Sequence, residues 1–199
     1  MLPPPAFFQR DPVTVARALL GQRLVRVVDG RRRAGTIVEV EAYLGVQDAA
    51  AHSFRGHRSP RNASMYEAGG VAYVYFTYGM HHCVNVVCGR ADEPVAVLLR
   101  ALEPTEGLDA MHAARPRAKR DADLCSGPAK LCQALAIDRR LDGVALTAPG
   151  PLFIERVRQR TLPNAAIAAA PRIGVDYAGA WAARPLRFYV RGNPHVSRP

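Results

Sequence analysis

The fold of this chain is decided by residues 36–43, which read TIVEVEAY. β-Branched residues in period-two alternation are typical of a strand, so we predict one over residues 36–44. Successive side chains of a strand point to opposite faces. One face of this strand is therefore predicted to carry Ile37, Glu39, Glu41 and Tyr43.

Two carboxylates on one face of an apolar strand are unusual, and two interpretations are open. At a rise of ~3.3 Å per residue, the Cα atoms of Glu39 and Glu41 lie roughly 6.6 Å apart. This separation is in the range of paired carboxylates in inverting glycoside hydrolases. The alternative is an exposed strand edge with both side chains in water. Arg100, in another apolar run, would need a partner if it is buried, and the candidates are a carboxylate such as Glu41, a phosphate or a bound water.

Turn residues and apolar periodicity divide the rest of the chain. Asp11 and Pro12 form an N-cap and first-turn pair, which predicts a helix that ends at Gly21. We expect strands at 24–28, 71–77, 82–87 and 94–102, a basic turn at 29–33, a basic helix and loop at 105–123, a helix opening at 126–128, short strands near 144, 152 and 186–190, and an alanine-rich connector at 164–170. No linker or repeat divides the chain. The prediction is one α+β domain over 1–199, a mainly antiparallel curved β-sheet with packed helices and a protruding β-hairpin.

Aromatic side chains and one histidine gather around the predicted hairpin. Tyr73 and Tyr75 share one strand face and would form a wall, with His52 in a long, aperiodic but ordered loop at 45–70. Tyr78 falls at the hairpin tip, where a large ring stays exposed. Exposed aromatics among arginines are typical of base stacking and of insertion into a base stack.

The charge balance favours a nucleic-acid partner. The chain has 27 Lys and Arg against 17 Asp and Glu, a net charge of +10 and a sequence pI near 10.1. Lysine occurs only at positions 119 and 130, so arginine supplies most of this charge, and its planar fork suits phosphates and base edges. A basic enzyme with no nucleic-acid substrate is the alternative.

Four cysteines, at positions 83, 88, 125 and 132, form no CxxC pair and match no zinc pattern. We expect buried, reduced thiols, which favours a reducing, cytoplasmic location. His81 and His82 are adjacent and would point to opposite faces of a strand, so we expect no metal site and no cofactor. The N-terminus lacks the features of a signal peptide, and no apolar run approaches the ~18 residues of a membrane helix, so no membrane association is expected.

Further motifs stand in a definite order along the chain. They are Glu41-Ala42-Tyr43, Ala51-His52-Ser53, Thr77-Tyr78-Gly79-Met80, Asn85, residues 98–104 (LLRALEP), residues 124–132 (LCSGPAKLC) and residues 186–192 (LRFYVRG). This order resembles that of the alkyladenine (3-methyladenine) DNA glycosylase family. The resemblance extends from about Val15 to Ser197, nearly the whole chain.

The resemblance implies a monofunctional base-excision repair enzyme without lyase activity. Such an enzyme flips alkylated or deaminated purines (3-methyladenine, 7-methylguanine, hypoxanthine, ethenoadenine) out of double-stranded DNA and hydrolyses the N-glycosidic bond, which leaves an abasic site. A monomer acting on the nucleoid is expected. The implied roles are general base for Glu41, water-holding arginine for Arg100, base contacts for Tyr43, His52 and Tyr75, exclusion of guanine's amino group for Asn85, and intercalation for Tyr78 and Met80.

The chain departs from the pattern of the family that it resembles in two places. The chain begins almost at its first helix, so the N-terminal extension of longer relatives is expected to be absent. His81-His82 stands where more apolar or aromatic residues are expected from the family, just beyond the hairpin tip.

Two other functions remain open. A non-catalytic module that marks damaged DNA would use the same basic face and hairpin. A carbohydrate hydrolase using Glu39 and Glu41 would leave the charge and the hairpin unexplained.

Overall fold

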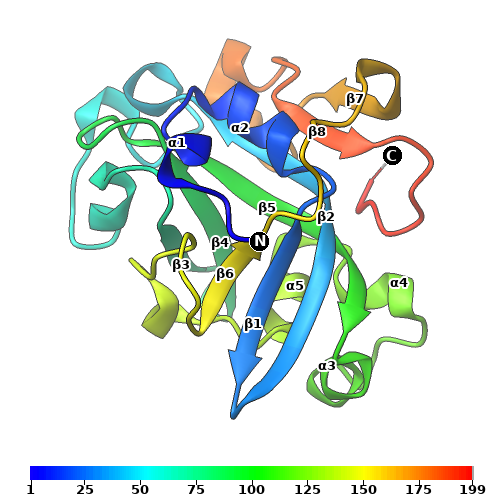
Figure 1. The fold of residues 1–199 in the computed structure, drawn as a ribbon. Helices are drawn as coiled ribbons and strands as arrows, with labels where there is room; N and C mark the ends of the chain where they lie inside the picture. Colours follow the sequence, from blue (N-terminus) through cyan, green and yellow to red (C-terminus); the bar gives the residue numbers. More distant parts are fainter. Residues whose placement is uncertain (199) are drawn as a thin grey trace.

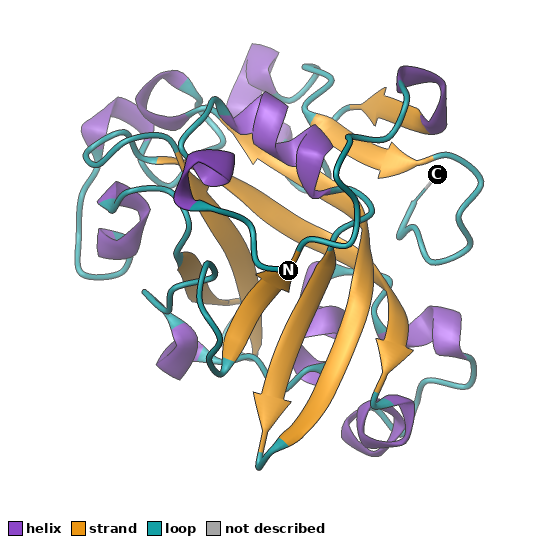
Figure 2. Cartoon of the chain, in the orientation of Figure 1, coloured by secondary structure: helices purple, strands orange, loops and turns teal. Residues whose placement is uncertain are grey.

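Strand β2 (Arg31–Tyr43) is the centre of the sheet in the computed structural model, which describes residues 1–198. Within these residues eight strands form one curled antiparallel sheet in the order β3-β4-β5-β2-β1-β6, with β8 beside β2 and β7 beside β8 (Figures 1 and 2). The other strands are β1 (Arg23–Val28), β3 (Ala72–Thr77), β4 (His81–Cys88), β5 (Val95–Glu106), β6 (Leu152–Glu155), β7 (Ile167–Ala170) and β8 (Arg187–Val190). The predicted α+β class and curved sheet are confirmed.

The neighbours of β2 explain how two glutamates come to be buried in its second half. β1 pairs with residues 31–36 of β2, β8 pairs with residues 39–41, and β5 runs along the other edge. Glu39 and Glu41 thus lie on an interior strand, and both are fully buried. The alternative of a solvated strand edge is excluded.

A β-bulge in β2 changes which side chains share a face. Ile37 and Glu39 pair with consecutive residues of β5, so Val38 is an extra residue on β2. Ile37 consequently packs in the main core with Val40 and Ala42. The prediction that Ile37 shares a face with Glu39 is wrong, because the bulge interrupts the period-two alternation.

Helices α2 (Pro12–Leu19) and α5 (Pro128–Ala134) pack on the apolar face of the sheet. Asp11 caps α2 as predicted, since its carboxylate accepts the Thr14 N–H at 2.8 Å. The other helical segments are α1 (Pro5–Phe8), α3 (Leu108–Ala114), α4 (Asp121–Leu124) and the 3-10 turns η1 (Gly45–Gln47), η2 (Phe54–Gly56), η3 (Ala63–Tyr66), η4 (Arg139–Leu141), η5 (Asn164–Ala166) and η6 (Asp176–Trp181). The other face of β3, β4 and β5 is left for polar and aromatic side chains.

Several expectations about the elements are wrong, and the strand expected near residue 144 is only an isolated bridge between Ala145 and Val71. Asp29 and Gly30 both have positive φ and make the β1–β2 turn alone, so residues 31–33 belong to β2 rather than to the turn. The strand expected to end at residue 102 continues to Glu106. Residues 164–170 are not a connector, because they form η5 and β7, and pairing with β8 overrides the weak strand preference of alanine.

The four cysteines, Cys83, Cys88, Cys125 and Cys132, are free and buried, as predicted. Burial raises the pKa of each thiol, that of Cys125 to about 12. Between residues 1 and 198, no helix is long and apolar enough to cross a membrane.

Candidate active site

A cavity of about 370 Å³ opens on the polar and aromatic face of the sheet. The predicted site residues that line it are Tyr43, His52, Tyr75, Tyr78, Asn85 and Arg100. They come from β2, the 45–70 loop, β3, the hairpin turn, β4 and β5, so the fold gathers side chains from six segments. The two remaining predicted residues do not line the cavity: Glu41 is fully buried behind its wall, and Met80 is exposed at the hairpin.

One wall of the cavity is aromatic. The His52 ring meets the Tyr75 ring edge-on with centroids 4.6 Å apart, and the Tyr73 ring lies 5.4 Å from that of Tyr75. The His52 Nδ1 is 2.7 Å from the Tyr73 hydroxyl. Burial, with a smaller effect of the Arg61 guanidinium, lowers the pKa of His52 below its ordinary 6.5. The imidazole is therefore neutral at neutral pH, with one N–H and one acceptor nitrogen.

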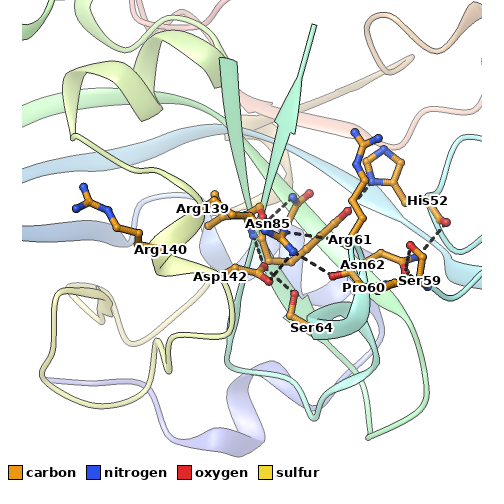
Figure 3. A network of polar contacts seen from close by, with 12 residues as sticks. His52, Ser59, Pro60, Arg61, Asn62, Ser64, Asn85, Arg139, Arg140 and Asp142 are labelled. Atoms are coloured by element: carbon orange, nitrogen blue, oxygen red, sulfur yellow. Dashed lines mark hydrogen bonds and ion pairs between the residues drawn. The ribbon is translucent and has the colours of Figure 1, made fainter. Parts of the chain in front are cut away.

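Polar contacts hold the loop that carries His52 against the sheet (Figure 3). Arg139 donates to two loop carbonyls and to the Val74 carbonyl on β3, and it pairs with Asp142 at 3.3 Å. Asp142 in turn accepts hydrogen bonds from the Ser64 hydroxyl and the Val74 N–H, each at 2.8 Å. The prediction of a long ordered loop is confirmed, and these bonds are its physical cause.

The Glu41 carboxylate is held by two hydrogen bonds and one ion pair, and all three partners are residues that line the cavity. Its Oε1 accepts the Ile173 N–H at 2.8 Å and lies 3.2 Å from an Arg100 Nη1. Its Oε2 accepts the Tyr43 hydroxyl at 2.9 Å. A carboxylate offers about four acceptor positions, so one position on Oε2 is left for a further donor.

Arg100 reaches both glutamates because it is itself an extra residue in the pairing. Glu39 and Val40 pair with the residues on either side of Arg100, which makes it a bulge on β5. Its Nη1 contacts Glu41, and its Nε lies 3.5 Å from the Glu39 Oε1. The predicted carboxylate partner for a buried Arg100 is confirmed.

Glu39 is bound away from the cavity. Arg187 pairs with its Oε1 at 2.8 Å, and the Ser197 N–H donates to its Oε2 at 2.7 Å. Neither glutamate lines the cavity itself, and neither do Arg187 and Ser197. Tyr43, Arg100 and Ile173, which contact Glu41, all line it. Of the two glutamates, Glu41 is thus the one beside the cavity, while Glu39 fastens β8 and the C-terminal segment to β2. This arrangement argues against two carboxylates acting together on a sugar.

Burial dominates the electrostatics of Glu41. Desolvation raises the pKa of its carboxyl above the ordinary 4.5, although the positive charge of Arg100 and the hydrogen bonds from Ile173 and Tyr43 act in the opposite direction. Burial and the neighbouring Glu41 charge raise the pKa of the Tyr43 hydroxyl. Tyr43 is therefore a neutral donor to Glu41 at any physiological pH.

The hairpin between β3 and β4 holds a large aromatic ring in solvent, as predicted. Tyr78 is 83% exposed and Met80 70% exposed. Tyr78 and Gly79 both have positive φ, at +52° and +67°, the combination that type I′ turns use. Since Tyr78 also borders the cavity, its ring stands at the mouth of the site.

Sequence reasoning missed the C-terminal wall of the cavity. Residues 173–175 and Tyr177 line it, and Tyr177 is 73% exposed, so a second large ring stands at the mouth. This segment is irregular and has no periodicity to reveal its position. The sequence signal for this wall is Tyr177, a large aromatic residue three positions after Gly174 in a stretch without apolar alternation.

Among residues 1–198, no three His, Cys, Asp or Glu side chains are grouped in a way that could hold a metal ion.

Comparisons with known proteins agree on one family. The family model for methylpurine-DNA glycosylase matches residues 6–194. The chain is 48% identical to the DNA-3-methyladenine glycosylases of Mus musculus and Homo sapiens over 97% and 96% of its length, and it spans only 60% and 66% of theirs. It is 46% identical to a putative 3-methyladenine DNA glycosylase of Bacillus cereus (strain G9842) over the full length of both chains.

Proposed function

The chain belongs to the methylpurine-DNA glycosylase family, and on that premise we propose that it excises damaged purines from double-stranded DNA by hydrolysis of the N-glycosidic bond. The observation that carries this proposal is the Glu41 carboxylate, whose two hydrogen-bond donors and ion-pair partner all line an aromatic cavity. A flipped base needs stacking surfaces, because it has lost its neighbours in the duplex. Tyr43, His52 and Tyr75 would supply these surfaces.

In the proposed step, Glu41 takes a proton from a water that uses the free acceptor position on Oε2. The water oxygen forms a bond to the anomeric carbon of the sugar as the bond from that carbon to the purine nitrogen breaks. The purine leaves with the electron pair of the broken bond. Arg100 would orient Glu41 and the water, since it is fixed by both glutamates.

The charge of the base decides how demanding this step is. Alkylated purines such as 3-methyladenine and 7-methylguanine are cationic, so they leave as neutral molecules. Hypoxanthine and ethenoadenine are neutral and need a proton as they leave, which makes them slower substrates. Asn85 borders the cavity and is our candidate for rejecting the amino group of guanine.

Several features support water as the nucleophile and DNA as the partner. Within residues 1–198 no lysine lines the cavity, so it offers no amine for a lyase reaction. The net charge of +10 suits a polyanion.

The proposed function is tested with a duplex that contains hypoxanthine or ethenoadenine. The protein is incubated with it, abasic sites are cleaved by alkali, and the released base is measured by chromatography. Glycosylase activity predicts strand cleavage only after alkali, together with free base. Tight, salt-dependent binding without free base would favour the non-catalytic binding module instead.

The pH dependence of base release is expected to have an acid limb above pH 4.5. Glu41 acts as a base only when it is ionised, and burial raises its pKa above that ordinary value, so the rate falls as the pH falls through the raised pKa. His52 is already neutral above its lowered pKa and adds no limb near pH 7. Single-turnover rates across pH 4–9 check this, and a midpoint at or below 4.5 would contradict it.

A further inference from the structure

Arg172 and Asp48 form a fully buried ion pair next to the site. The pair is bidentate, with Nη1 2.5 Å from Oδ2 and Nη2 2.8 Å from Oδ1. Neither residue lines the cavity or touches Glu41. Replacing both partners of a buried pair by uncharged groups is often neutral or stabilising. Stability is therefore a weak explanation for the pair, and its contacts indicate another.

The Arg172 guanidinium fixes the end of β2 just beyond Glu41. It donates to the Ala42 carbonyl at 3.0 Å and lies 4.6 Å from the centroid of the Tyr43 ring. The next residue along the chain, Ile173, supplies the N–H that binds the Glu41 Oε1. The buried Arg172 side chain thus contacts the Tyr43 ring, and its own backbone directly precedes the N–H that binds Glu41.

Asp48 extends the same support to a third wall. Its Oδ2 accepts the Leu44 N–H and its Oδ1 the Ala50 N–H, each at 3.0 Å, which closes the turn that follows β2. Ala50 lines the cavity, and its carbonyl lies 3.4 Å from the Tyr177 hydroxyl. The ion pair therefore joins the end of β2, the turn at 44–50 and the segment at 172–177.

We propose that Arg172, held by Asp48, is a positioning residue that sets the Tyr43 ring and the Ile173 N–H around Glu41 for base release. The inference rests on the proposed function. A displacement of ~1 Å at a reacting group can cost about 100-fold in rate. Lysine keeps the charge of arginine but lacks the planar fork that meets a carboxylate, a carbonyl and a ring at once.

The test is Arg172→Lys, assayed by single-turnover release of hypoxanthine and by its pH profile. We expect the rate to fall about 100-fold and the acid limb to move to higher pH, because the Ile173 N–H no longer stabilises ionised Glu41. The charged and titratable groups that face Glu41 are Arg100, Glu39, Tyr43, Tyr75, Cys83, Arg172 and Tyr177. Those other than Arg172 are unchanged in this variant.

Arg26→Lys is the matched control. Arg26 donates to the carbonyls of Val27, Ala136 and Pro151, none of which lines the cavity. The control weakens arginine hydrogen bonds to carbonyls away from the cavity, and we expect its rate and acid limb to match those of the wild type. Melting temperatures of both variants show whether a loss of rate follows from unfolding. Equal rate losses in the two variants, in proportion to their unfolded fractions, would overturn the inference.

A second variant covers the case in which Arg172→Lys does not fold. Asp48→Asn combined with Arg172→Gln removes both charges, which avoids an unpaired buried charge. The same loss of rate is expected, because the amide of glutamine cannot make the contacts of the planar guanidinium with the Ala42 carbonyl and the Tyr43 ring. Wild-type rate and acid limb in a folded variant would overturn the inference and leave the proposed function standing. No base release by the wild type would overturn both.

Discussion

Glu41→Gln is expected to lower the single-turnover rate of base release by about 10²–10⁴-fold, the range that general base catalysis contributes, while lesion binding is retained. Glutamine keeps the shape of the side chain. Its Oε1 can still accept from Ile173 and Arg100, and the Tyr43 hydroxyl can rotate to accept from the new amide. The substitution therefore removes the capacity to take a proton and leaves the packing in place.

Free base is measured by chromatography and binding to lesion duplex by fluorescence anisotropy. Glu103→Gln is the control, because Glu103 lies on the same strand as Arg100 but accepts from Asn193 and does not line the cavity. Its rate is expected to equal that of the wild type. Undiminished base release by Glu41→Gln would remove Glu41 as the general base.

Tyr78→Ser is expected to weaken binding to lesion duplex by roughly 1–3 kcal/mol, the usual contribution of one aromatic ring stacked on a base. This corresponds to a rise of about 5- to 150-fold in the dissociation constant. The ring is 83% exposed, so its loss leaves no cavity in the protein and the melting temperature should hardly change. The effect therefore reports on DNA contact rather than on folding.

Tyr78→Phe separates the ring from its hydroxyl, and we expect it to bind like the wild type. Phe76→Ser is a further control, because Phe76 is 47% exposed on the same hairpin but does not line the cavity. An unchanged dissociation constant for Tyr78→Ser would argue against insertion of the ring into the base stack.

The parts of the fold that sequence predicts well are those with a local physical signal. The cap at Asp11 and the hairpin around Tyr78 both depend on neighbouring residues, and the structure confirms them. The bulge at Val38 has no such signal. It results from the pairing of β2 with β5, residues that are distant in the chain.

The same distinction applies to the candidate site. Tyr43 and Tyr75 lie on strands whose alternation indicates their face, so the face of each ring could be anticipated. Ile173 acts through a backbone N–H, which no side-chain pattern reveals. Tyr177 lies on a short 3-10 turn in an irregular segment, and only the folded chain brings it to the mouth of the cavity.

The burial of the four cysteines has a consequence for the protein's own survival. A thiolate is the form of cysteine that reacts with electrophiles, and these thiols stay protonated because burial raises their pKa. The methylating agents that would create the proposed substrates attack nucleophiles indiscriminately. A chain whose cysteine thiols stay buried and protonated can keep working while those agents are still present.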